Sequence, residues 1–176
     1  VEKVASQVMT TVKTIAAAAE GTGANAEDAA NQAFDSIVTV LQSKASSSET
    51  LNLANTTDLT SVETQAKSKL ASLSGIDTTS FNTTLDTAMD SVKLVNDVIN
   101  NITDTDLTSN ANKGVFAAAD HLKTQTKTAA TAEKATPGSG NQHITMNDAD
   151  AVNTAVNSAT SNAAPTDISL SKTSIA

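Results

Sequence analysis

The chain has 176 residues, a formal net charge of −8 and a pI near 4.5, and every basic residue is a lysine. Because phosphate binding depends on clustered lysine and arginine, this charge argues against nucleic acid as a partner. Cysteine is absent, which excludes disulfides, thiolate catalysis and cysteine-ligated zinc, and no apolar stretch approaches the length of a membrane span.

Apolar residues at three- and four-residue spacing predict a first helix from Val1 to Ala19, which Gly21 ends. Asn25 is expected to cap a second helix, with Glu27 and Asp28 in its first turn, where acidic side chains favour the helix dipole. The inward stripe predicted for the second helix consists of Ala30, Ala33, Phe34, Ile37, Val38 and Leu41.

Thr60 and Glu63 have the spacing of a capping box, in which each side chain bonds the other residue's backbone amide. A third helix is therefore predicted to begin at Thr60 and to stop at Gly75. Asp77 or Thr78 is expected to cap a fourth helix. Its apolar stripe, the clearest in the chain, consists of Phe81, Leu85, Met89, Val92, Val95 or Asn96, Ile99 and Ile102.

A fifth helix is predicted from Asp106 to Leu122. Gly114 lies inside it and indicates either close backbone packing or a break. Residues 123–134 have no apolar stripe, so we expect a frayed helical extension, and residues 136–140 have the composition of a linker.

A sixth helix is predicted from Met146 to Ala159, with its cap at Thr145. Five or six amphipathic helices joined by short connections predict an all-α fold, an antiparallel up-and-down bundle with an extended C-terminal tail. The expected organisation is a helical bundle over 1–135, a linker over 136–143, an additional helix packed on the bundle over 144–163, and the start of a following β domain over 164–176.

No catalytic, cofactor-binding or metal-binding residue is predicted. His121 and His143 lie on different segments, without a carboxylate at ligand spacing. Ser169 and Lys172 have the spacing of a serine–lysine pair, but in a strand-like tail residues three apart point to opposite faces. Nucleophilic catalysis therefore has no support in the sequence.

Two pairs of aspartates resemble the start of a calcium loop, Asp104 with Asp106 and Asp148 with Asp150. Such a loop needs a glycine at its sixth position and a glutamate at its twelfth, and neither pair is followed by them. We therefore expect these carboxylates to cap helix starts.

The final residues read differently from the rest of the chain, because Ile168 and Leu170 alternate with serines at the period of a half-buried strand. The stretch Ala164–Ser171, followed by Ser174–Ala176, resembles the opening A-strand of a bacterial cadherin-like repeat of very large secreted or surface-anchored adhesins. In that family a glutamate usually follows this stretch and helps to bind calcium between repeats. The resemblance covers only this tail, so it implies no cofactor here and calcium only in the neighbouring repeat.

On this resemblance, we expect a piece of a longer bacterial protein that is extracellular or at the cell surface. The expected function is that of a non-enzymatic structural or interaction module of an adhesin-like protein, acting as spacer, cap or partner-binding domain. Its expected partners are the neighbouring β-repeats and a protein or surface of unspecified identity, with no nucleic acid and no membrane span. Two alternatives are a self-associating filament or secretion-system component of flagellin-like composition, and a helical bundle that binds a small ligand.

Overall fold

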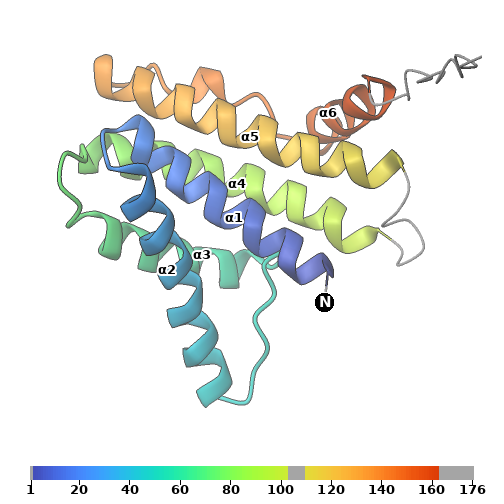
Figure 1. Ribbon diagram of the computed structural model, residues 1–176, viewed down its shortest axis with the longest axis horizontal. Coiled ribbons are helices and arrows are strands. Elements are labelled where there is room, and N and C mark those ends of the chain that lie inside the picture. The colour runs from blue at the N-terminus through green and yellow to red at the C-terminus, as the bar shows by residue number, and fades with distance from the viewer. Residues whose placement is uncertain (1, 103–109, 163–176) are drawn as a thin grey trace, which may run out of the picture.

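The computed structural model describes residues 2–102 and 110–162, and within these residues every secondary-structure element is a helix (Figure 1). The elements are α1 (Glu2–Gly21), α2 (Ala26–Ser46), α3 (Thr56–Leu70), α4 (Thr78–Asn101), α5 (Asn110–Ala135), the 3-10 helix η2 (Asn141–His143) and α6 (Ala149–Asn162). The predicted all-α bundle is confirmed, whereas the tail from Ala164 with its strand-like pattern lies outside the described residues.

Helices α1, α4 and α5 lie side by side along the long axis of the molecule, and α2 crosses α1 steeply (Figure 1). Two contacts fix the antiparallel pairing of α1 with α4. Gln7 Nε2 donates to the backbone oxygen of Asn96 at 3.1 Å, and Lys3 Nζ donates to that of Asn100 at 3.4 Å. Helix α3 packs on α2 and α4, and α6 packs on α5.

The core consists of small and medium-sized aliphatic side chains around a single buried phenylalanine, Phe81. Threonines are also buried in α1, where the hydroxyls of Thr10, Thr11 and Thr14 each donate to the carbonyl four residues earlier at 2.8–2.9 Å. These bonds satisfy the hydroxyls inside the helix, so small polar residues are tolerated at positions that face other helices.

One close approach of backbones is between the end of α1 and the C-terminal part of α5. A Cβ atom added at Gly21 would lie 2.6 Å from Ala130 Cβ and 2.6 Å from the carbonyl oxygen of Lys127. Carbon atoms normally stay about 3.5–4 Å apart, so only a residue without a side chain fits here.

A second close approach joins the turn after α1 to the turn before α4. Gly23 has a φ of +113° and Gly75 a φ of +83°, and each would place an added Cβ within 2.7 Å of the other's carbonyl oxygen. The amide of Asp77 donates to the carbonyl of Thr22 at 3.1 Å, which fixes the start of α4 beside the end of α1.

Two predicted helix caps are confirmed. Asn25 Oδ1 accepts from the amides of Glu27 and Asp28 at 2.9 and 3.3 Å, and Asp77 Oδ1 accepts from the amide of Ser80 at 2.9 Å. These side chains satisfy amides that have no partner inside their helices.

The predicted start of the third helix at Thr60 is wrong, because α3 begins at Thr56 and Asn55 caps it. Asn55 Oδ1 accepts from the amide of Thr57 at 2.9 Å. Asp58, in the first turn of α3, connects this turn to other parts of the chain. Its carboxylate lies 2.8 Å from Lys44 Nζ of α2 and accepts from the amide of Asn52 at 2.8 Å. This buried pairing, which connects two helices and their loop, favours the earlier cap.

The predicted inward stripe of α2 is also partly wrong. The buried positions of this helix are Ala29, Ala33, Ser36, Ile37 and Val40. Phe34 and Leu41 are instead 52% and 48% exposed. The buried face of α2 therefore combines three small residues with Ile37 and Val40, while Phe34 and Leu41 lie on the outer side of the helix.

Helix α5 is longer than predicted, because residues 123–134 are a full continuation of the helix and not a frayed end. Ala129, Ala130, Thr126 and Glu133 are buried there. The helix also continues through Gly114, which is buried, so this glycine marks no break. Small side chains bury this segment against α1 without a conventional apolar stripe.

The segment after α5, for which we predicted a linker, folds back on that helix. The Glu133 carboxylate accepts from the amides of Gly138 and Gly140 at 2.8 and 2.9 Å. Beyond it Met146 is buried in an extended stretch, and α6 begins only at Ala149. The predicted cap at Thr145 is therefore displaced to Asp148, whose Oδ1 accepts from the amide of Ala151 at 2.7 Å.

Replacing Gly21 by alanine should destabilise the protein by about 1–3 kcal/mol, because the added methyl group overlaps the backbone of α5. Helix propensity alone predicts a gain of about 1 kcal/mol, so the sign of the change separates the two effects. Urea denaturation followed by circular dichroism measures it. Asn31→Ala, at an exposed position of α2, is the matched control and should not destabilise. A Gly21→Ala variant as stable as the parent would contradict the close packing.

The Asp58–Lys44 pair should make stability depend on pH. Burial raises the pKa of Asp58, but hydrogen bonds from Lys44 and from the amide of Asn52 outweigh it, so this pKa lies below its usual value of 3.8. The stabilisation is therefore present above about pH 4 and is lost as the pH falls through the lowered pKa. Asp58→Asn should cost about 1 kcal/mol at pH 7, and the difference from the parent should shrink as the pH falls below about 4 in acid-dependent melting curves. A difference that does not change with pH would refute this.

Candidate interaction surface

The two histidines are parts of surface elements, and one of them takes part in attaching the segment after α5. His121 is exposed on α5, with its Nε2 2.9 Å from Gln125 Nε2. Gln125 donates to Thr145 Oγ1 at 2.7 Å and accepts from the amide of Thr145 at 3.1 Å. His143 lies in η2, and no cluster of three or more metal-ligating side chains occurs within the described residues.

Of the two aspartate pairs that resemble the start of a calcium loop, only the second lies within the described residues. Asp148 caps α6, and Asp150 lies in the first turn of the same helix, as expected for capping residues. Asp104 and Asp106 lie outside the described residues, as does the Ser169–Lys172 pair.

A further carboxyl pair, which the sequence analysis did not identify, links α3 to α4. Glu63 Oε1 lies 2.6 Å from Lys67 Nζ, and Lys67 also pairs with Asp86. Burial and the hydrogen bond with Asp86 raise the pKa of Glu63. Burial also raises the pKa of Asp86, but bonds from Glu63 and Lys67 outweigh it and lower this pKa. The two acids thus share Lys67 as an interhelical contact.

The most distinctive surface feature is a small groove between α1 and α5, with a volume of about 280 Å³. We call it the α1/α5 groove; it is lined by Ala5, Ser6, Met9, Thr10, Lys13, Phe116, Ala119 and Asp120. Met9 is 50% and Phe116 51% exposed, although Phe116 is one of only three aromatic residues in the chain. A large apolar side chain left half in water loses much of the free energy that its burial would give.

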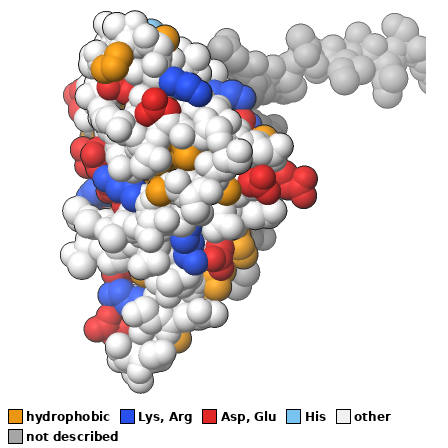
Figure 2. Space-filling model, turned by 90° about the vertical axis from the view of Figure 1, so that its left-hand side faces the viewer, with side chains coloured by type: hydrophobic (Ala, Val, Ile, Leu, Met, Phe, Trp, Pro, Cys, Tyr) orange, Lys and Arg blue, Asp and Glu red, His pale blue; other side chains and the backbone are white. Residues whose placement is uncertain are grey.

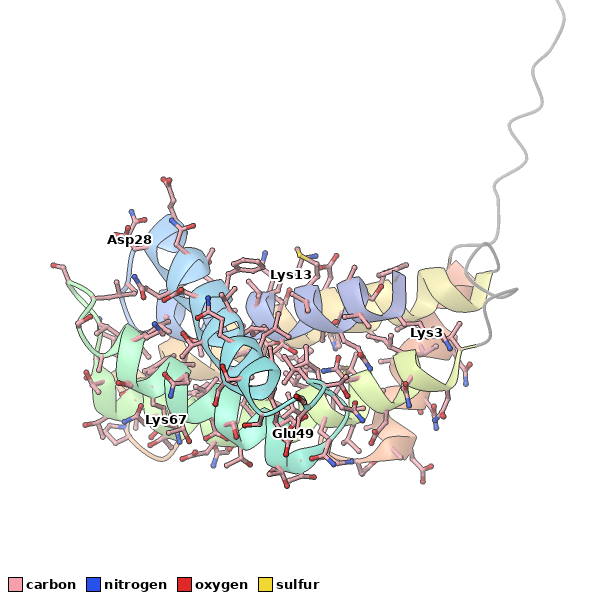
Figure 3. The ribbon with its side chains drawn as sticks, turned by 90° about the horizontal axis from the view of Figure 1, so that it is seen from below. Lys3, Lys13, Asp28, Glu49 and Lys67 are labelled. Carbon is pink, nitrogen blue, oxygen red and sulfur yellow. The ribbon has the colours of Figure 1, made fainter. Side chains whose placement is uncertain are left out.

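The two walls of the α1/α5 groove are held in register by ion pairs. Lys13 Nζ lies 2.8 Å from Asp120 Oδ1, and Lys127 Nζ lies 2.8 Å from Glu20 Oε2. Both pairs are 107 residues apart in the sequence, so α1 and α5 run parallel. Helix α1 contributes the lysine to the first pair and the glutamate, seven residues later, to the second. In Figure 3, Lys13 of α1 and Lys67 of α3 lie on opposite sides of the molecule.

Other large apolar side chains are exposed at Val4 of α1 and along α2. On α2, Phe34 and Leu41 form a ridge on one helix and line none of the described grooves between helices. On the end of the molecule shown in Figure 2, lysine and acidic side chains are interspersed and hydrophobic side chains occur in separate small groups. The α1/α5 groove differs because apolar residues from two helices meet there.

Two larger grooves, of about 420 Å³ each, have a more polar lining. One lies between α2 and α3 and is lined mainly by hydroxyl and amide side chains, with Lys44. The other lies between α5 and α6, beside His121 and Thr145. Neither is lined by a large apolar side chain that is half exposed, so the α1/α5 groove is the stronger candidate for contact with a protein.

Met9 and Phe116 have no role predicted from the sequence, because both lie off the apolar stripes of their helices. Their position off these stripes was nevertheless informative. In a chain with few large apolar residues, an apolar side chain off the inward stripe of an amphipathic helix lies towards solvent or towards a partner.

Comparison with protein-family models, with curated proteins and with solved structures found no match for this chain. None of the described helices is both long enough and apolar enough to span a membrane.

Proposed function

We propose that the chain is a non-enzymatic interaction module of a larger adhesin-like protein, extracellular or at the bacterial cell surface, and that it contacts a protein partner through the α1/α5 groove. The resemblance of the tail to a cadherin-like strand supports the placement in such a protein, with calcium in the neighbouring repeat and none required in this domain. Of the three roles considered, spacer, cap and partner-binding domain, the groove favours the last.

The observation that carries this proposal is the exposure of Met9 and Phe116 on facing walls of one groove. Interfaces are enriched in methionine and aromatic residues, and their energetic centres are apolar side chains that lose contact with water on binding. The ion pair between Lys13 and Asp120 lies in the same groove, beside the apolar residues, as expected for a polar rim.

Display of the chain on a non-adherent bacterium tests this proposal. Cells that carry the parent chain should attach to at least one of three surfaces, namely a surface coated with the purified parent chain, a surface coated with other proteins and a cultured cell layer. The double variant Met9→Asp/Phe116→Asp should reduce that attachment at least about tenfold, because two charges replace the apolar contact. The matched control is Phe34→Asp/Leu41→Asp, which introduces the same two charges at comparably exposed apolar residues of α2 outside the groove and should attach like the parent. Equal attachment by the Met9/Phe116 variant, or no attachment by the parent to any of these surfaces, would contradict the proposal. Circular dichroism of the purified variants confirms that each is folded.

A further inference from the structure

We infer that the partner of the α1/α5 groove is the same groove of a second copy, so that the chain forms a two-fold symmetric dimer. This inference rests on the proposed function, because it needs the groove to be an interaction surface. It is carried by the register of four large side chains of the groove, Met9, Lys13, Phe116 and Asp120, and by their charges.

The large side chains on the two walls of the groove have the same sequence spacing and lie at the same height along the helices. Met9 and Lys13 are four residues apart on α1, and Phe116 and Asp120 are four residues apart on α5. Each α5 residue follows its α1 counterpart by the 107 residues that separate the ion-paired Lys13 and Asp120. Because the helices are parallel, Met9 lies level with Phe116 just as Lys13 lies level with Asp120.

A two-fold axis along the groove makes these four residues complementary to themselves. Rotation about such an axis places α1 of one copy over α5 of the other, at an unchanged level along the helices. Met9 then faces Phe116 of the second copy and Lys13 faces its Asp120, and both contacts occur twice. A thioether against an aromatic ring and a lysine against a carboxylate are each favourable contacts.

The charge of the groove also suits a second copy better than the rest of the surface does. The chain carries a net charge of −8, so two copies repel each other over most orientations. The charged residues that line the groove are one lysine and one aspartate, which makes it locally neutral. The Lys13 and Asp120 side chains are 39% and 63% exposed, so each retains surface for a second partner beyond its own ion pair.

Reversing the charge of either Lys13 or Asp120 leaves two charged residues of the same sign in the groove, so that two copies of such a variant should repel each other there. Lys13→Asp gives a groove with two acidic residues, and Asp120→Lys gives one with two basic residues. Sedimentation velocity of the full chain, from about 1 µM to about 1 mM, should show a reversible dimer for the parent and at least about tenfold weaker self-association for each variant. An equimolar mixture of the two variants should form a heterodimer, because the acidic groove of one variant then faces the basic groove of the other.

The mixture separates an interface from a folding defect, since neither protein changes between the separate and mixed samples. Phe34→Asp, on the outer ridge of α2, should dimerise like the parent. A parent that stays monomeric up to about 1 mM, or a mixture without heterodimer, would overturn the dimer. If attachment of displayed cells still depends on Met9 and Phe116 in that case, the proposed function stands and only the identity of the partner is refuted.

Discussion

The close contact between the end of α1 and the C-terminal part of α5 constrains the rest of the molecule. Gly21 allows the backbone of α1 to reach Ala130 and the carbonyl of Lys127, and buried alanines and threonines line the remainder of the seam. Helices packed through small residues gain dispersion contacts between backbones, but they bury less apolar area per residue than helices packed through leucine. The stability of such a seam therefore depends on a defined register, and the two ion pairs at the same sequence separation are consistent with that register.

The elements that local chemistry determines could be predicted from the sequence. Asn25 and Asp77 cap helices because a short polar side chain just before a helix can accept hydrogen bonds from the free amides of the first turn. The cap of α3 was not predictable in this way, since Asn55 and Thr60 both offer local caps. The choice between them involves Lys44, which is remote in sequence and reaches Asp58 only after α2 and α3 have met.

The same limit explains the errors on α2 and α5. A hydrophobic stripe identifies the inward face when large residues face the core, but in this protein small residues occupy the tightest junctions. Phe34 and Leu41 are consequently on the outer side of α2, and residues 123–134 are buried in spite of having no large apolar side chain. Ranking the faces of a helix by apolar bulk thus assigns some positions, such as Phe34 and Leu41, to the wrong side. The position of Met9 and Phe116 off the inward stripes was readable in the sequence, but their meeting in one groove was not, because it depends on a tertiary register that one sequence does not contain.

The groove and the seam are two consequences of one helix pairing. The parallel register that brings Gly21 to Ala130 also brings Met9 level with Phe116 and Lys13 to Asp120, because all these contacts lie along the same two helices. The tight contact lies towards one end, where small residues let the backbones touch, and the groove lies towards the other, where larger side chains lie at its surface. The side chains at Met9 and Phe116 therefore do not contribute to closing the seam, and their retention at the surface is explained more economically by contact with a partner than by folding. A partner that occupied this groove would contact both helices at once and would favour the register on which the remainder of the fold is built, so binding and stability would be linked through the α1/α5 pair.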